Sequence, residues 1–135
     1  MKRILAVILT AALLASSLFM LFSCGEHGRT VTIAGNSIEF SASAGEFDTL
    51  AFEGMPVAGT ASSGDAAKAT FEYAPEAASV TFYPEDGGIP VEAPSARDGF
   101  TLSFTVPEVS GTCGVHIEYS TDGTLYNLYF RLEVN

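Results

Sequence analysis

The chain is poor in several residue types, and each shortage restricts what it can do. It has no tryptophan, two cysteines, and 6 basic against 16 acidic residues in a length of 135. Lys2 and Arg3 precede Cys24, so four basic and 16 acidic residues follow, a formal charge of −12 with histidines neutral. This charge repels phosphate backbones, so we predict no nucleic-acid partner and expect any electrostatically recruited partner to be cationic.

Sequence signatures of catalysis and of metal binding are also missing. The chain contains no Gly-Xaa-Ser-Xaa-Gly, no glycine-rich phosphate loop and no HExxH pattern. Cys113 and His116 are three apart on a predicted strand, so their side chains point to opposite faces and cannot form a nucleophile–base pair. His116 and Glu118 share a face but supply only two ligands, fewer than zinc requires. We therefore predict no catalytic residue, no metal and no cofactor, with an unrecognised enzyme site as an alternative.

The N-terminal segment has the features of an export signal. Lys2 and Arg3 precede an apolar run over residues 4–22, which ends in Leu21-Phe22-Ser23-Cys24. This ending resembles the lipobox of bacterial lipoproteins, in which the cysteine is lipidated and becomes the mature N-terminus. The resemblance implies a signal peptide over 1–23, lipidation of Cys24 and a lipidated tether over 24–29.

Two other interpretations of this segment remain open. Nineteen apolar or small residues, 4–22, are also about long enough to span a bilayer as an uncleaved helix, and Cys24 could instead pair with Cys113. Both membrane interpretations give one topology, since positive charge before the run places residues 25–135 outside the cytoplasm. We therefore expect a cell-envelope location, lipid-anchored on the outer face of a bacterial membrane or in the periplasm.

From Thr30 onward, apolar residues recur with a period of two between turn residues, which is typical of β-strands. We predict a loop over 56–67 and at best a ragged edge strand over 84–99, where three prolines fall. The predicted strands are TVTIA (30–34), SIEFSA (37–42), DTLAFE (48–53), KATFEYA (68–74), SVTFYP (79–84), FTLSFTV (100–106), TCGVHIEYS (112–120) and LYNLYFRLEV (125–134).

The last two predicted strands allow a specific register. Asp122-Gly123 is a dipeptide favoured in two-residue hairpin turns, where both positions need positive φ. A turn there opposes residues whose numbers sum to 245 and places apolar pairs on one face and polar residues on the other, which we expect to face solvent. The inward pairs are Tyr119 with Tyr126, Ile117 with Leu128, Val115 with Phe130 and Cys113 with Leu132, and the outward pairs are Glu118 with Asn127, His116 with Tyr129 and Gly114 with Arg131.

One-sided antiparallel sheets must cover their apolar faces, and about seven to eight strands in roughly 105 residues suit two packed sheets. The stretch GFTLSFTVPEVSGTCGVHIEYS (99–120) looks like strands E and F of immunoglobulin-like domains. The inter-sheet cysteine pair and the strand-C tryptophan of that family are absent. We predict an all-β fold over 30–135, an immunoglobulin-like antiparallel β-sandwich of about seven to eight strands after an N-terminal signal segment.

These observations lead to a non-enzymatic binding or adaptor module, held at the membrane through lipid on Cys24 and binding an unknown protein or glycan ligand. Its candidate binding patch is the outward cluster of His116, Tyr129 and Arg131, an aromatic and cationic group on a negative surface; a solvated face is the alternative. The alternative function is inhibition of a secreted cationic hydrolase such as a lysozyme or protease, with PEDGGIP (84–90) as a protruding loop. We further predict that Cys113 is buried with a free thiol.

Overall fold

The computed structural model describes residues 30–135, and this part of the chain is all-β. The predicted signal peptide (1–23), Cys24 and the tether (24–29) lie outside the described residues. The described elements are β1 (Thr30–Ile33), β2 (Asn36–Ile38), β3 (Ser41–Ala44), the 3₁₀ helix η1 (Thr49–Phe52), β4 (Val57–Ala61), β5 (Ala66–Thr70), β6 (Ala77–Pro84), β7 (Val91–Glu92), β8 (Ser95–Asp98), β9 (Thr101–Thr105), β10 (Gly111–Thr121) and β11 (Thr124–Val134).

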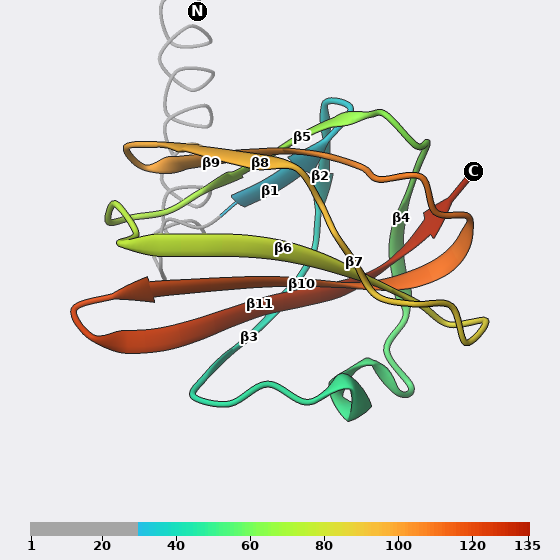
Figure 1. Cartoon of the computed structure of the whole chain (residues 1–135), viewed down its shortest axis with the longest axis horizontal. Helices are drawn as coiled ribbons and strands as arrows, with labels where there is room; N and C mark the ends of the chain where they lie inside the picture. Colours follow the sequence, from blue (N-terminus) through green and yellow to red (C-terminus); the bar gives the residue numbers. More distant parts are fainter. Residues whose placement is uncertain (1–29) are drawn as a thin grey trace, which may run out of the picture.

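The strands form two sheets, which do not close into a barrel. The first sheet has the order β2-β1-β5-β9-β8, and the second has the order β3-β11-β10-β6-β7. Strand β4 also pairs with β11, in parallel, beyond the residues of β11 that pair with β3. The other pairings are antiparallel. Figure 1 shows the two sheets as layers, with β1, β5, β8 and β9 in one and β6, β10 and β11 in the other.

The space between the sheets is filled by the apolar residues that the period of two predicted to point inward. Leu102 of the first sheet and Val80 and Phe82 of the second are at most 1% exposed, and they belong to one core cluster with residues of both sheets. Alternation along each strand therefore sorts side chains into core and outer face, as the pleat of a strand requires.

The terminal hairpin has the predicted register. Asp122 and Gly123 both have positive φ, 51° and 74°, as a two-residue turn of this kind requires. Tyr119 lies opposite Tyr126, and the pairing continues without a shift to Gly111 opposite Val134. The prediction from the Asp-Gly turn is confirmed along both strands.

Several other predicted elements were wrong. The segment predicted as a strand over 48–53 contains η1, which the Asp48 carboxylate caps by accepting from the Leu50 amide at 3.0 Å. The predicted strand over 37–42 is divided between β2 and β3, and the predicted loop over 56–67 contains β4. The ragged edge strand predicted over 84–99 corresponds to two short edge strands, β7 and β8, one in each sheet. The described chain thus has eleven strands, because short edge strands pair with the predicted ones.

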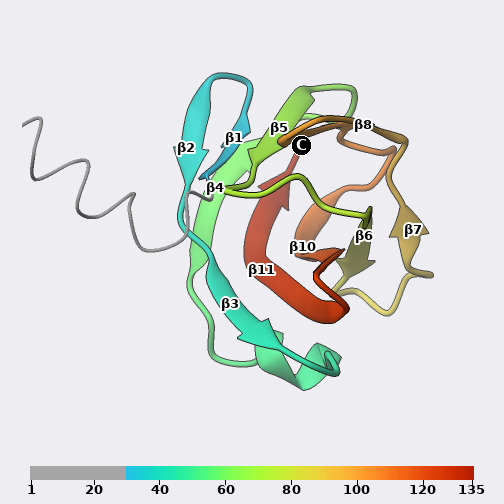
Figure 2. The ribbon, with the colours of Figure 1, turned by 90° about the vertical axis from the view of Figure 1, so that its left-hand side faces the viewer.

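The strands β5, β6, β8, β9, β10 and β11 run between the same two ends of the domain (Figure 1). We call one the hairpin end; it contains the β10–β11 turn, the β5–β6 connection (71–76) and the β8–β9 turn (99–100), and it faces the viewer in Figure 2. The opposite end, called the loop end, contains the β6–β7 connection (85–90), which lies at the right of Figure 1. Thr30, the first residue of β1, pairs with Thr70 of β5, and Thr70 pairs on its other side with Thr101 of β9. Thr101 directly follows the β8–β9 turn, so the described chain starts at the hairpin end.

Candidate functional site

The outer face of β10 and β11 is covered by residues 45–56, here called the covering segment. Phe47 stacks on the His116 ring with ring centroids 3.8 Å apart and planes 8° apart. Phe52 packs edge-on against Phe47 and Tyr129, with centroids 5.4 and 6.3 Å away. The expectation that this face is solvated was therefore wrong at His116, which is only 6% exposed, and at Asn127, which is fully buried.

A short hydrogen-bonded chain fixes the covering segment to the sheet. The Nε2 atom of His116 lies 2.8 Å from Oδ1 of Asn127, and Nδ2 of Asn127 donates to the Gly45 carbonyl at 2.8 Å. Asn127 is fully buried, so this contact satisfies an amide that would otherwise be costly to bury. Burial lowers the pKa of His116, against smaller raising effects of the Asn127 hydrogen bond and the Glu118 charge.

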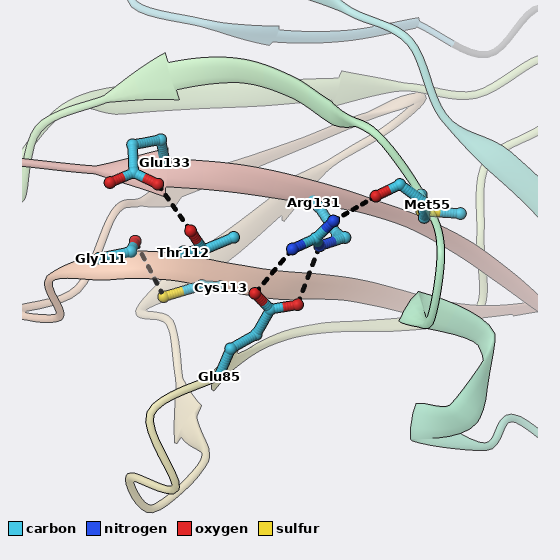
Figure 3. Close-up of polar contacts among 7 residues, drawn as sticks. All are labelled: Met55, Glu85, Gly111, Thr112, Cys113, Arg131 and Glu133. Atoms are coloured by element: carbon cyan, nitrogen blue, oxygen red, sulfur yellow. Dashed lines mark hydrogen bonds and ion pairs between the residues drawn. The ribbon is translucent and has the colours of Figure 1, made fainter.

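Arg131 lies at the other end of the predicted patch and connects three elements (Figure 3). Its Nε and Nη2 atoms each donate to the Glu85 carboxylate at 2.8 Å, and Nη1 donates to the Met55 carbonyl. This two-point contact with Glu85 raises the pKa of Arg131. A paired fork of this kind fixes orientation as well as charge, so Arg131 holds the β6–β7 connection and the covering segment against β11.

The structure thus brings His116, Tyr129 and Arg131 onto one face, as the register predicted. Tyr129 is half-buried and contacts Phe47, with ring centroids 5.4 Å apart. The three residues face the chain's own covering segment and Glu85, and their role as a binding patch stays a prediction.

The segment that Arg131 holds in place is the β6–β7 connection, residues 85–90, which we call the acidic loop. The Glu85 amide donates to the Thr112 carbonyl at 3.0 Å, and the Gly88 amide donates to the Asp86 carboxylate at 2.9 Å. Gly87 between them has φ of +88°, a conformation in which a side chain is strained. The Asp86 contact is within the loop, and the contacts of Glu85 join the loop to β10 and β11. Ile89, near the end of the loop, is 84% exposed.

Cys113 lies beneath the acidic loop and is buried with a free thiol, as predicted. Its Sγ lies 3.7 Å from the Gly111 carbonyl (Figure 3). Burial, and then the charges of Asp86, Glu85 and Glu133, raise the pKa of this thiol. A raised pKa disfavours the thiolate, and the side chain points inward while His116 points outward, so the two residues form no nucleophile–base pair.

Sequence reasoning missed the covering segment, and Phe47 and Phe52 with it. A signal was present at Gly114, because a glycine inside a strand often marks a place where another group approaches closely. Gly114 lies directly beneath the Phe52 ring.

Within residues 30–135 no group of three metal-ligating side chains is present, and no helix is long and apolar enough to cross a membrane. In the same residues every buried side-chain polar atom has a hydrogen-bond partner. Comparison of the chain with known proteins found no matching family model, no matching curated protein and no matching solved structure.

Proposed function

We propose that the protein is a bacterial cell-envelope lipoprotein, held outside the cytoplasm by lipid on Cys24, whose domain is a non-enzymatic binding module. The export-type segment and its LFSC ending support the anchor. The acidic loop supports the binding role, because it is held by hydrogen bonds of Asp86 and Glu85 and also presents the large apolar side chain of Ile89 to solvent.

We also propose that the domain is an immunoglobulin-like sandwich. The order β1-β5-β9-β8 matches strands A-B-E-D of that family, and β11-β10-β6-β7 matches G-F-C-C′. In this assignment β9 and β10 are strands E and F, the two strands for which the sequence carried the resemblance. The segment from β2 to β4, including the covering segment, is then an insertion between strands A and B.

The acidic loop has the properties of a rigid binding element. Its internal and anchoring hydrogen bonds exist without a partner, so binding loses little conformational entropy in the loop. Ile89 is the large apolar side chain with the greatest exposure in the described chain, and such a side chain contributes most when it enters a partner's pocket. Arg131 offsets the charge of Glu85, and the carboxylates of Asp86 and Glu92 remain near Ile89 in the sequence.

This chemistry favours a partner with an apolar pocket surrounded by basic residues. The same observation supports the second candidate, inhibition of a secreted cationic hydrolase such as a lysozyme or protease. A rigid loop that inserts one apolar residue suits either role.

The test uses the full-length protein and two variants, Ile89→Ser and Leu50→Ser. Both side chains are exposed, but Leu50, 64% exposed, lies on η1 outside the acidic loop and serves as the matched control. Envelope proteins retained by the wild type and the Leu50 variant, but not by the Ile89 variant, are the expected result. Equal retention by all three would show that the loop is not the binding element.

Two further measurements separate the parts of the proposal. Cells given a palmitate analogue should label the wild type and not Cys24→Ala, and absence of label from the wild type would exclude the lipid anchor. If the partner is a hydrolase, titration with the purified protein should abolish its activity at a stoichiometric ratio. A partner without hydrolase activity would favour the adaptor role.

A further inference from the structure

The hairpin end of the domain exposes apolar side chains on neighbouring connections. Tyr73 of the β5–β6 connection is 67% exposed and Phe100 of the β8–β9 turn is 56% exposed. The Phe71 amide donates to the Phe100 carbonyl at 2.8 Å, so these two connections lie side by side. Leu125, 37% exposed, is the second residue of β11, and β11 begins at the same end (Figure 2).

The described chain also begins at this end. Thr30 pairs with Thr70, the last residue of β5. Phe71, which follows Thr70, donates its amide to the carbonyl of Phe100 in the β8–β9 turn. Only residues 25–29 separate Cys24 from Thr30, and these six chain steps span at most about 22 Å even when fully extended. An anchor on Cys24 therefore keeps the hairpin end within that distance of the bilayer surface.

We propose that the hairpin end rests on the zwitterionic headgroup region of the bilayer that holds the anchor, with Tyr73 and Phe100 in contact with the lipid. This inference rests on the proposed lipid anchor. Aromatic side chains favour the membrane–water interface, where an apolar ring and a polar edge are both accommodated. The tether supplies a high effective concentration of lipid, so a weak contact suffices to orient the domain.

The acidic residues at this end determine which lipids suit it. Among residues 30–135, Glu72, Glu76, Asp98 and Asp122 are exposed there together with the cation Arg97, which donates from Nη1 to the Pro75 carbonyl at 2.6 Å. An excess of carboxylates is repelled by anionic headgroups, and the repulsion is reduced by salt. Contact should therefore be strongest on zwitterionic lipid and weaker on anionic lipid at low ionic strength.

This orientation has a consequence for binding. The eleven residues of β10 extend for about 37 Å between the two ends of the domain. With the hairpin end on the bilayer, the acidic loop and Ile89 point away from the membrane, where a soluble partner can reach them.

The experiment uses the absence of tryptophan from the chain, since a single introduced tryptophan is then the dominant reporter. Full-length Tyr73→Trp protein is reconstituted into phosphatidylcholine vesicles with plain or brominated acyl chains, and Phe100→Trp is a second reporter should the first variant misfold. Ile89→Trp at the loop end is the matched control. We expect brominated lipid to reduce emission about twofold for the hairpin-end variants and to leave the Ile89→Trp variant unchanged, because only interfacial side chains approach the acyl chains.

The outcomes distinguish this inference from the proposed function. Lipid-labelled protein whose hairpin-end tryptophans are not quenched would overturn the orientation and leave the anchor intact. Protein without lipid label that also fails to bind vesicles would overturn both. A hairpin-end tryptophan that responds to polylysine but not to vesicles would overturn the membrane contact in favour of a cationic protein surface.

Discussion

Replacement of Gly114 by alanine tests whether the covering segment packs as a rigid layer. A Cβ atom at Gly114 would lie 2.5 Å from both Cδ2 and Cε2 of Phe52. Carbon atoms in contact are normally about 3.5–4.0 Å apart, so the ring must move by about 1 Å. Its neighbours resist the movement, because Phe52 is only 6% exposed and packs against Phe47 and Tyr83, with ring centroids 5.4 and 5.9 Å away.

The magnitude is set by two opposing effects. Adding a methyl group to a packed site costs about 1–3 kcal/mol in unfolding free energy. Replacing a strand glycine by alanine returns about 0.5–1 kcal/mol of backbone entropy. We therefore expect Gly114→Ala to destabilise the domain by about 1–2 kcal/mol, and Phe52→Ala by about 3–5 kcal/mol, the usual cost of removing a buried ring.

The decisive measurement is the double-mutant cycle. With Phe52 replaced by alanine, the clash is gone and Gly114→Ala should become neutral or slightly stabilising, which gives a coupling free energy of about 1–3 kcal/mol. Urea unfolding of residues 25–135, monitored by circular dichroism, measures all four species. Gly59→Ala is the control, since the one close contact of its Cβ would be the flexible Cδ1 end of Ile38 at 2.5 Å. An equal cost of Gly114→Ala with and without Phe52 would refute the proposed packing.

Other predictions concern the core, the turn and the two titratable side chains on β10. Phe130→Ala should cost about 3–5 kcal/mol because Phe130 is 1% exposed, and Tyr129→Ala should cost less because Tyr129 is half-buried on the outer face; equal losses in urea unfolding would contradict this. Gly123→Val should lower the melting temperature, with a cost of at least about 1–2 kcal/mol, since φ of +74° is unfavourable for a side chain; an unchanged melting temperature would oppose it. The Cys113 thiol, buried and with a raised pKa, should react with a maleimide only after unfolding, and fast labelling of native Cys24→Ala protein would disprove its burial. Burial lowers the pKa of His116 from 6.5, so the unfolded state takes up the proton at a higher pH than the folded state. The free energy of unfolding should therefore fall as the pH drops below 6.5, until the pKa of the folded state is passed. If the His116→Gln variant keeps the same pH dependence of stability, another group causes it.

The sequence by itself determined the all-β class and the geometry of the terminal hairpin. Both depend on local rules: alternation of apolar residues assigns the two faces of a strand, and Asp122-Gly123 selects a two-residue turn that fixes every opposed pair. The burial of Cys113 was predictable for the same reason, since the register places it opposite Leu132 on the inward face. These features depend on neighbours within one hairpin.

The tertiary structure alone decided what covers the outer face. Alternation showed that His116 and Asn127 point outward, but it could not show that Phe47, far away in the sequence, lies over them. The same limit explains the strand predicted over 48–53, where the apolar residues at 50 and 52 alternate as in a strand although the segment forms a 3₁₀ helix. The role of Arg131 likewise depends on Glu85, 46 residues away. Local periodicity records which way a side chain points, whereas its solvent exposure and charge partners depend on segments that only the folded chain brings together.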